Sequence, residues 1–565
     1  MESASAPTAP APGHRVKVET FLRILPLVAF TFSALIHAFG FVAHGETAQI
    51  WDDALFFRRV AYNTVHHGVA GWNYQDGPVF MNTSQLYQLI TTLLLPLAPH
   101  HFNAAVVLWS AVCASISYLV LWNIARKEGG DQEIERTGFL FVMMHAPPIF
   151  LAITTGMETC TIFLVLAAFL YVIMNPRLRH PVLLAAMNLL VFLTRPDAIL
   201  MSFILSVSFL GVSRRTFQFC ALTAIGMSAV CLSLYAYYGT PLPLATFLKI
   251  SQLSVYDREY LALGNPDKLK NLVETGLVTL PLLPLIVMRF DRANLTLVGA
   301  ALAFVAFHDM TTNEIMGYHA RFYAPALPLL FLAGLRGLSN VRSAEEKLAV
   351  VVGGAAVAGL ALIAFKRAWI ENATVGFDAN LVPLRHYLTY FLGIPILALL
   401  RLIPQHVRRI VVPCLAAFVT IAGAVRMTAA QPLVVKSDLR IYERALQNDQ
   451  SLTGIDVIRR CFSQPVQLVH SELGIPGVLL SESRIIDYTG LANPSVARGH
   501  FDFEKLCAGE RPEFIFRPHW THKRLNEQLS ASPCLASQYT GAAVSESLFV
   551  RNDLIEKFNV CPADN

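Results

Sequence analysis

Residues 22–42 read LRILPLVAFTFSALIHAFGFV, and this stretch decides the class of protein. An α-helix needs about 20 mostly apolar residues to cross the hydrocarbon core of a bilayer. Similar apolar runs recur along the chain, some of them shorter than a full span. The predicted helices lie at residues 22–42, 103–125, 137–154, 158–174, 181–194, 196–212, 217–238, 272–288, 294–308, 322–338, 347–365, 386–402 and 409–427. The sequence therefore predicts a polytopic α-helical membrane protein of about 13 spans.

A further apolar run at residues 86–98 is shorter and is interrupted by Pro96 and followed by Pro99. Its length is too small for an ordinary span, which needs about 20 residues. We interpret it as a re-entrant or interfacial helix.

Composition agrees with this class. Of the 565 residues, 54% are hydrophobic and 15% are charged, whereas soluble domains carry about 25% charged residues. The basic residues are dispersed among short loops instead of forming one face, so no nucleic-acid partner is expected. Residues 1–20 are polar and rich in alanine and proline, and no removable signal peptide is expected.

The distribution of lysine and arginine predicts the topology, because cytoplasmic loops carry an excess of positive charge. With residues 1–20 in the cytoplasm, alternate short loops are basic. These loops contain Arg126 and Lys127, Arg177 and Arg179, Arg214 and Arg215, Arg289 and Arg292, Arg342 and Lys347, and Arg408 and Arg409. The long opposite loops lie at residues 43–85, 239–271, 309–321 and 366–385. An odd number of spans then places the C-terminal tail on the outer side.

The tail, residues 428–565, has frequent charges, short apolar runs and turn signals, which predict a small α/β domain. It contains Cys461, Cys507, Cys534 and Cys561. Four cysteines on the outer side of a membrane favour two disulfides in an oxidising compartment. Three pairings are open. A zinc site is the less favoured alternative, because zinc sites use closely spaced cysteine pairs.

Asp52 and Asp53 follow the first apolar run, at the predicted boundary between membrane and water. Charge there is costly unless it is used or solvated. Arg58 and Arg59 come directly after them. This combination is what a membrane enzyme needs to activate a hydroxyl beside a lipid phosphate. The alternative is that the two aspartates cap a helix over residues 54–65 by accepting free backbone N–H groups, and both roles can coexist.

Short motifs spread over residues 50–500 resemble one family of enzymes. The matching residues are Asp52-Asp53-Ala54, Arg59, Ala61, Asn63, Trp72-Asn73, Gly77, Val79, Asn82-Thr83-Ser84, Gly156-Met157-Glu158-Thr159, Thr194-Arg195-Pro196-Asp197, Pro241-Leu242-Pro243 with Lys249, Tyr318, Arg321, Pro325, and DYTGLANP at residues 487–494. In this order they resemble the bacterial polytopic GT-C glycosyltransferases, which include the mycobacterial terminal arabinofuranosyltransferases. The sequence departs from that pattern at His66 and His67 and at Asn493.

The resemblance implies a GT-C-like membrane domain over residues 21–427, with a catalytic outer loop at 43–102 and a periplasmic domain at 428–565. It also implies a multi-pass protein of the bacterial cytoplasmic membrane whose active site faces the periplasm. The implied donor is a sugar on polyprenyl phosphate, transferred by inversion with Asp52 or Asp53 as the base. Nucleotide sugars do not reach that side, and the chain has no Gly-rich phosphate loop. By analogy the sugar is arabinofuranose and the acceptor a glycan or a glycoprotein.

Four cations on the predicted outer side are candidates for binding the donor phosphate, because arginine and lysine pair well with phosphate oxygens. They are Arg59, Arg195, Lys249 and Arg321. Each of three has a structural alternative. Arg195 can form an ion pair with Asp197, Lys249 can extend to the membrane interface, and Arg321 can simply mark the end of a span.

Other polar and aromatic residues of the outer side are candidates for binding substrate. They are Glu158, Asp197, Tyr318, His319, His308, Trp72, Asn73, Thr83 and Ser84. Glu158 has an equal alternative role as a helix cap, where negative charge is favourable. No cofactor is assigned. Binding of a divalent metal by His308 and Asp309, together with Asp52 or Asp53, is an open alternative, although no HExxH-like spacing is present.

Two other functions are compatible with part of this pattern. A ligase or polymerase of lipid-linked oligosaccharides is the nearest enzyme, and it requires a larger acceptor cleft. A lipid-sugar transporter would have similar helices, but its sequence would show internal repeats with broken helices in matching positions. We see no such repeat in the sequence.

Overall fold

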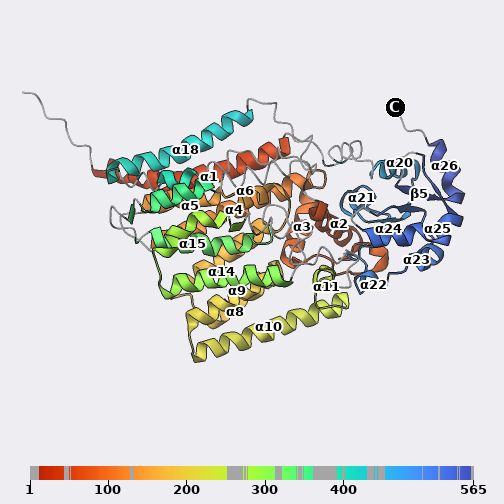
Figure 1. The fold of residues 1–565 in the computed structure, drawn as a ribbon, viewed down its shortest axis with the longest axis horizontal. Coiled ribbons are helices and arrows are strands. Elements are labelled where there is room, and N and C mark those ends of the chain that lie inside the picture. The colour runs from red at the N-terminus through yellow and green to blue at the C-terminus, as the bar shows by residue number, and fades with distance from the viewer. Residues whose placement is uncertain are drawn as a thin grey trace, which may run out of the picture.

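A computed structural model describes most of the chain. The described residues are 12–43, 50, 52–127, 133–250, 272, 275–276, 278–311, 321–338, 340, 346–347, 349–360, 390, 392–397, 400, 403–428, 438, 442, 452–498, 501–518, 522–543, 545 and 547–561. They form a bundle of helices with a smaller α/β region at one end (Figure 1). Of the residues expected to bind substrate, Tyr318, His319 and the side chain of Lys249 lie outside the described part.

The bundle consists of apolar helices that lie beside one another in Figure 1. Their bounds are α1 Pro12–Ala43, α4 Phe102–Lys127, α5 Glu133–Met144, α6 Pro147–Thr154, α7 Thr159–Met174, α8 Pro181–Thr194, α9 Ile199–Leu210, α10 Arg214–Tyr238, α13 Leu283–Val287, α14 Arg292–Thr311, α15 Leu327–Leu338 and α18 Gln405–Thr428. Among the described residues, 5 helices are long and apolar enough to cross a membrane, or up to 6 if a bent pair counts as one span. The larger predicted number of spans stays a prediction, although helical residues occur in every predicted apolar run.

The bent pair consists of α5 and α6, whose axes differ by 57°. Pro147 and Pro148 begin α6. A proline lacks the N–H that would continue the preceding helix, but it fits the first turn of a new one. The break therefore follows directly from the local sequence.

Three short helices lie between the bundle and the C-terminal region in Figure 1. They are α2 Asp52–His67, α3 Gln85–Leu97 and α11 Leu244–Ile250. Helix α3 coincides with the short apolar run for which an interfacial or re-entrant helix is predicted. Leu89, Leu93 and Leu97, spaced by four residues, are exposed on one face of α3, while Tyr87 and Leu95 are buried on another.

The C-terminal region contains a five-stranded sheet of order β2-β1-β3-β5-β4. Strands β1, β2 and β3 are parallel, and β4 and β5 are antiparallel to their neighbours. The elements are α20 Thr453–Cys461, β1 Gln467–His470, α21 Gly474–Leu479, β2 Arg484–Asp487, α22 Pro494–Ala497, α23 Phe503–Glu510, β3 Phe514–Phe516, α24 Lys523–Ser530, α25 Pro533–Gln538, β4 Tyr539–Gly541, β5 Leu548–Arg551 and α26 Ile555–Val560. The predicted mixture of strands and short helices is therefore present in the tail.

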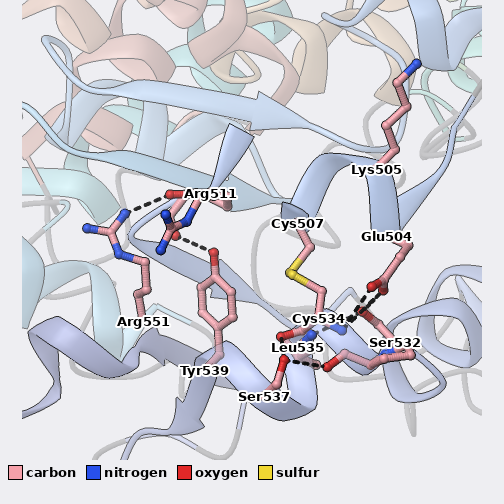
Figure 2. The surroundings of a disulfide bond; sticks show 12 residues. Glu504, Lys505, Cys507, Arg511, Ser532, Cys534, Leu535, Ser537, Tyr539 and Arg551 are labelled. Carbon is pink, nitrogen blue, oxygen red and sulfur yellow. Dashed lines mark hydrogen bonds between the residues drawn. A yellow bond between two sulfur atoms is a disulfide. The ribbon is translucent and has the colours of Figure 1, made fainter. Parts of the chain in front are cut away.

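Two disulfides hold the C-terminal region, as the sequence predicts. Cys461 pairs with Cys561, and Cys507 pairs with Cys534. The second bond joins α23 to α25, and Glu504 supports the same junction by accepting a hydrogen bond of 3.0 Å from the backbone N–H of Cys534 (Figure 2). The structure thus selects one of the three pairings that the sequence left open.

The helix ends next to the described basic loop residues lie at the opposite end of the bundle from the C-terminal region (Figure 1). At the basic end, Arg23 forms an ion pair of 3.0 Å with Glu133, which begins α5. The positive-inside rule expects the basic loops to lie together on one side of the membrane, and this arrangement agrees with it. The assignment of the basic end to the cytoplasm stays a prediction.

Candidate active site

The first turn of α2 carries both aspartates of the predicted catalytic pair. The Oδ2 atom of Asp53 lies 2.7 Å from Nη2 of Arg321, which forms an ion pair with it. The Asp53 side chain is 24% exposed and that of Arg321 10% exposed. Two charged residues that are 268 positions apart in the sequence therefore meet at one point, next to the C-terminal region.

A second ion pair adjoins the first. Arg195 binds Asp197 with two hydrogen bonds, from Nε to Oδ1 at 3.0 Å and from Nη2 to Oδ2 at 2.9 Å. Nη1 of Arg195 also donates to the backbone carbonyl of Arg321 at 3.3 Å. His308 completes the group, with Nε2 3.6 Å from Oδ2 of Asp197. The ion pair that the sequence offered for Arg195 is present, and it is part of a connected charged cluster.

Glu158 lies close enough to Arg195 to interact with it electrostatically. It is the residue before α7, but its side chain makes no capping hydrogen bond. Glu158 therefore occupies the N-cap position of the structural alternative, although its carboxylate makes no capping hydrogen bond. Its Oε2 atom is buried and has no hydrogen-bond partner among the described residues. Nearby, the Tyr87 hydroxyl donates to the carbonyl of Gly156 at 2.6 Å, which ties α3 to this motif.

Asp52 differs from Asp53 although the two are adjacent. Its Oδ2 atom accepts a hydrogen bond of 3.2 Å from the backbone N–H of Gly474, at the start of α21. Burial, together with the negative charges of Glu472 and Asp53, raises the pKa of Asp52 to about 8. Asp53 has an arginine partner, whereas Asp52 lies beside two other acids, so the two carboxylates have different chemistry.

Arg59, expected to bind phosphate, serves a structural purpose. Its side chain is fully buried, and burial lowers its pKa to about 9. Its N–H groups donate to the carbonyls of Trp72, Gly477, Leu480 and Ser483 and to Oδ1 of Asn73, at 2.6–3.2 Å. These five bonds use every N–H that a guanidinium has. The expectation of phosphate binding is corrected: Arg59 fastens α2 to the C-terminal region.

Trp72 and Asn73 also join this part of the chain to the C-terminal region. This structural role replaces the contact with substrate that the sequence predicts for them. Trp72 is 1% exposed, and its indole N–H donates to the carbonyl of Ile485 at 3.1 Å. Asn73 both donates to that carbonyl and accepts from the Ile485 N–H, at 3.0 Å each. Both side chains are therefore engaged with strand β2.

Ser84 and Thr83 precede α3. The Ser84 hydroxyl is buried and accepts the backbone N–H of Tyr87 at 3.2 Å, so it caps the helix instead of facing a substrate. Thr83 is partly exposed. The expected role of Ser84 is thus replaced by a structural one, because an N-cap hydroxyl satisfies an unpaired backbone donor.

The sequence does not predict the partner of Arg58. This arginine forms a buried ion pair of 3.0 Å with Asp438, a residue that lies between α18 and β1 in the sequence. Asp438 also accepts the backbone N–H groups of Phe102 and Asn103, at the start of α4. Nothing in the sequence around Asp438 signals this contact, because its partners lie more than 300 positions away.

The tail motif at residues 487–494 is a tight loop that packs against α11. Asp487 accepts hydrogen bonds from the backbone N–H groups of Thr489 and Ala492, at 2.7 and 2.6 Å. Gly490 has φ +94°, and a Cβ atom there would lie 3.1 Å from the side chain of Leu248. The motif therefore supports the helix that carries Lys249.

A metal site involving Asp52 or Asp53 and His308 is not formed. His308 lies beside Asp197, and it stacks on Phe322 with ring centroids 5.1 Å apart. Within the described residues, no group of three or more His, Cys, Asp or Glu side chains is arranged to hold a metal ion.

Comparison with known proteins bears on the fold. No protein-family model matches the chain, and no curated protein matches it. Two solved structures of ArnT from Cupriavidus metallidurans do match. The structure bound to undecaprenyl phosphate is 14% identical, with a TM-score of 0.52, and the match covers 96% of this chain and 98% of that chain. The apo structure is 16% identical, with a TM-score of 0.55 and coverages of 94% and 98%.

At this identity the likeness shows the fold, and it does so along nearly the whole chain. The protein is mostly helical and shares its fold with these two structures. The comparisons do not extend to the mycobacterial arabinofuranosyltransferases that the sequence motifs resemble.

Proposed function

We propose that the protein is a membrane glycosyltransferase that moves a sugar from a polyprenyl-phosphate donor to an acceptor of the cell envelope. The observation that carries this proposal is the meeting of Asp53 with Arg321 at 2.7 Å, beside Arg195 and Asp52. A carboxylate base and phosphate-binding cations are the two requirements of the reaction. Support also comes from the fold, which is shared with a protein bound to undecaprenyl phosphate.

The reaction is a single displacement. The acceptor hydroxyl gives its proton to a carboxylate as its oxygen bonds to the anomeric carbon of the donor sugar. The bond between that carbon and the phosphate oxygen breaks, and polyprenyl phosphate leaves with the electron pair. Arg321 and Arg195 stabilise the negative charge that develops on the phosphate, as donors fixed in advance do in other enzymes. The configuration at the anomeric carbon is inverted.

The different surroundings of the two aspartates support different roles for them in this mechanism. A general base works best when its pKa is near the operating pH. Asp52, with a pKa of about 8, fits this condition. Asp53 holds Arg321 in position through their ion pair. Glu158, near Arg195, is placed to accept a hydrogen bond from a sugar hydroxyl.

The proposal includes the finer expectations from the sequence. Arabinofuranose is the proposed sugar, a glycan or glycoprotein the proposed acceptor, and the periplasmic face of the cytoplasmic membrane the proposed location. A ligase or polymerase of lipid-linked oligosaccharides would use the same class of donor and would differ in the size of the acceptor. A lipid-sugar transporter would not require Asp52 as a base.

The test uses purified protein in lipid nanodiscs with a panel of synthetic polyprenyl-phosphate sugars, including arabinofuranose. Mass spectrometry measures sugar released to water or to an added glycan. The wild type should consume at least one donor, and Asp52→Asn/Asp53→Asn should not, while flipping of a fluorescent lipid-linked sugar should be the same in both. The matched control is Asp553→Asn, an exposed acid on the C-terminal surface, which should behave as the wild type.

Failure of the wild type to consume any donor would overturn the proposal. Full activity of the double variant would remove the aspartates from the reaction, and loss of lipid flipping in that variant would favour the transporter.

A further inference from the structure

The turn at residues 155–158 carries a carboxylate whose hydrogen-bonding capacity is not used by the protein. Glu158 is 7% exposed, and its Oε2 atom is buried without a hydrogen-bond partner in the described part of the chain. A buried charged oxygen without a donor is costly, because it has lost its water and gained nothing in exchange. Native proteins keep few such groups, and a ligand or a water molecule has to supply the missing donor.

The turn that carries Glu158 is held from two sides. The Tyr87 hydroxyl in α3 donates to the carbonyl of Gly156 at 2.6 Å. Tyr87 is fully buried, and its ring packs edge-on against Phe57 of α2 with ring centroids 4.9 Å apart. On the other side, Gly156 has φ +72°, and a Cβ atom there would lie 3.0 Å from Cβ of Ile50, just before α2. Such fixed support is what a precise binding residue requires.

The same carboxylate lies beside the cations proposed to hold the donor phosphate. Glu158 is close enough to Arg195 to interact with it electrostatically, and Nη1 of Arg195 donates to the carbonyl of Arg321. The short helix Ala324–Ala326, which follows Arg321, packs against α7, and Glu158 directly precedes α7. The buried oxygen of Glu158 therefore belongs to the part of the site where phosphate and sugar are joined.

The chemistry of the donor identifies the group that reaches this oxygen. The phosphate is bonded to the anomeric carbon, whose other neighbours are the ring oxygen and carbon 2. The ring oxygen has no hydrogen to donate. The nearest group of the sugar that can donate a hydrogen bond is therefore the hydroxyl on carbon 2.

We propose that Glu158 selects donor sugars with a free hydroxyl at carbon 2, by accepting a hydrogen bond from that hydroxyl. This inference rests on the proposed function and adds the substrate class, to which arabinofuranose belongs. A site built around a hydroxyl discriminates against the analogue that lacks it, because its polar group is then left unpaired. In glycoside hydrolysis, hydrogen bonds to the hydroxyl at carbon 2 strengthen in the transition state. The contact should therefore raise kcat/KM for such donors.

The test compares two donors that differ only at carbon 2, with the protein in lipid nanodiscs. One is a polyprenyl-phosphate sugar that carries the hydroxyl and is consumed by the wild type, and the other is its 2-deoxy counterpart. The measured quantity is the ratio of their kcat/KM values. Comparison of this ratio between the wild type and a variant cancels the intrinsic reactivity of the two donors. Glu158→Ala should lower the ratio about 10–100-fold, the effect of losing a hydrogen bond to a charged group. Glu158→Gln keeps an acceptor oxygen and should lower the ratio less.

Tyr87→Phe tests whether the turn positions Glu158. This change removes the hydroxyl that holds Gly156 and keeps the aromatic ring, so it should lower the same ratio by about threefold to tenfold. Added to Glu158→Ala, it should not change the ratio further, because the contact is already absent. The matched control is Tyr118→Phe. Tyr118 is also fully buried, and its hydroxyl donates to the carbonyl of Thr137 at 2.7 Å. The control should keep the wild-type ratio.

The outcomes are distinguishable. A wild type that is inactive with every donor overturns the proposed function and this inference together. An active wild type that consumes the 2-deoxy donor as well as its hydroxyl counterpart overturns this inference alone. The same holds for a Glu158→Ala variant that loses activity equally with both donors. Circular dichroism and thermal unfolding identify a variant that has lost its fold. If Glu158→Ala does not fold, Glu158→Gln decides, and a wild-type ratio in that variant overturns the inference.

Discussion

The first and second turns of α2 carry charges that look alike in the sequence and differ in the structure. Asp53 in the first turn meets Arg321, and both side chains are partly accessible. Arg59 in the second turn is buried and donates all of its N–H groups to the protein. A charged residue at a membrane boundary can therefore serve chemistry or assembly.

The largest expected effect is on the first turn. Asp52→Asn should lower kcat by about 10²–10⁴-fold, the usual contribution of a general base. The folded state holds the proton of Asp52 more tightly than the unfolded state, so its stability falls as the pH rises from about 4 towards 8. Asparagine removes this loss, and the variant should unfold at a higher temperature than the wild type at pH 8. Steady-state kinetics and calorimetry measure the two effects.

The second turn should respond in the opposite way. Arg59→Ala leaves five acceptors of the loop and the C-terminal region without their donor, and it should destabilise the protein by at least about 3 kcal/mol. Arg321→Ala should destabilise the protein less than Arg59→Ala does, because it breaks one ion pair instead of five hydrogen bonds, and it should lower transfer about 100-fold, because its loss removes a stabiliser of the leaving phosphate. Denaturant unfolding and transfer assays provide the comparison. Equal effects of the two variants on stability would contradict it.

The pH dependence sharpens the contrast between Asp52 and Asp53. Asp52 acts only when ionised, and its pKa is about 8. The rate of transfer should therefore fall about tenfold for each pH unit below that value and level off above it. A limb near pH 4 would instead point to a carboxylate other than Asp52 as the base. The profile of kcat/KM for the acceptor is the measurement.

The smallest effect is expected at the end of α2. His67 lies 3.3 Å from Glu482, but their side chains are 24% and 44% exposed. Such surface pairs contribute about 0–1 kcal/mol. Glu482→Gln should leave transfer unchanged and shift the unfolding free energy by less than about 1 kcal/mol. A larger loss would mean that the fastening of α2 to the C-terminal region extends beyond the contacts of Arg59.

The candidate site was predicted in part. Asp52, Asp53, Arg195 and Arg321 were named from the sequence, and the structure brings them to one end of the bundle. The roles of Arg59, Trp72 and Ser84 were not predicted correctly. Their partners lie in other elements or in a helix start whose geometry a motif does not reveal. The contact of Asp52 with Gly474 had no signal in the sequence, because it depends on the connection after β1.

The sequence by itself determined the apolar helices, the different character of the tail and the presence of two disulfides. These properties depend on composition and on neighbours along the chain, which hydropathy and periodicity report directly. The tertiary structure alone decided which cysteines pair, which arginine meets Asp53 and which is consumed in packing. Those outcomes depend on contacts between residues hundreds of positions apart, and local pattern carries no information about them.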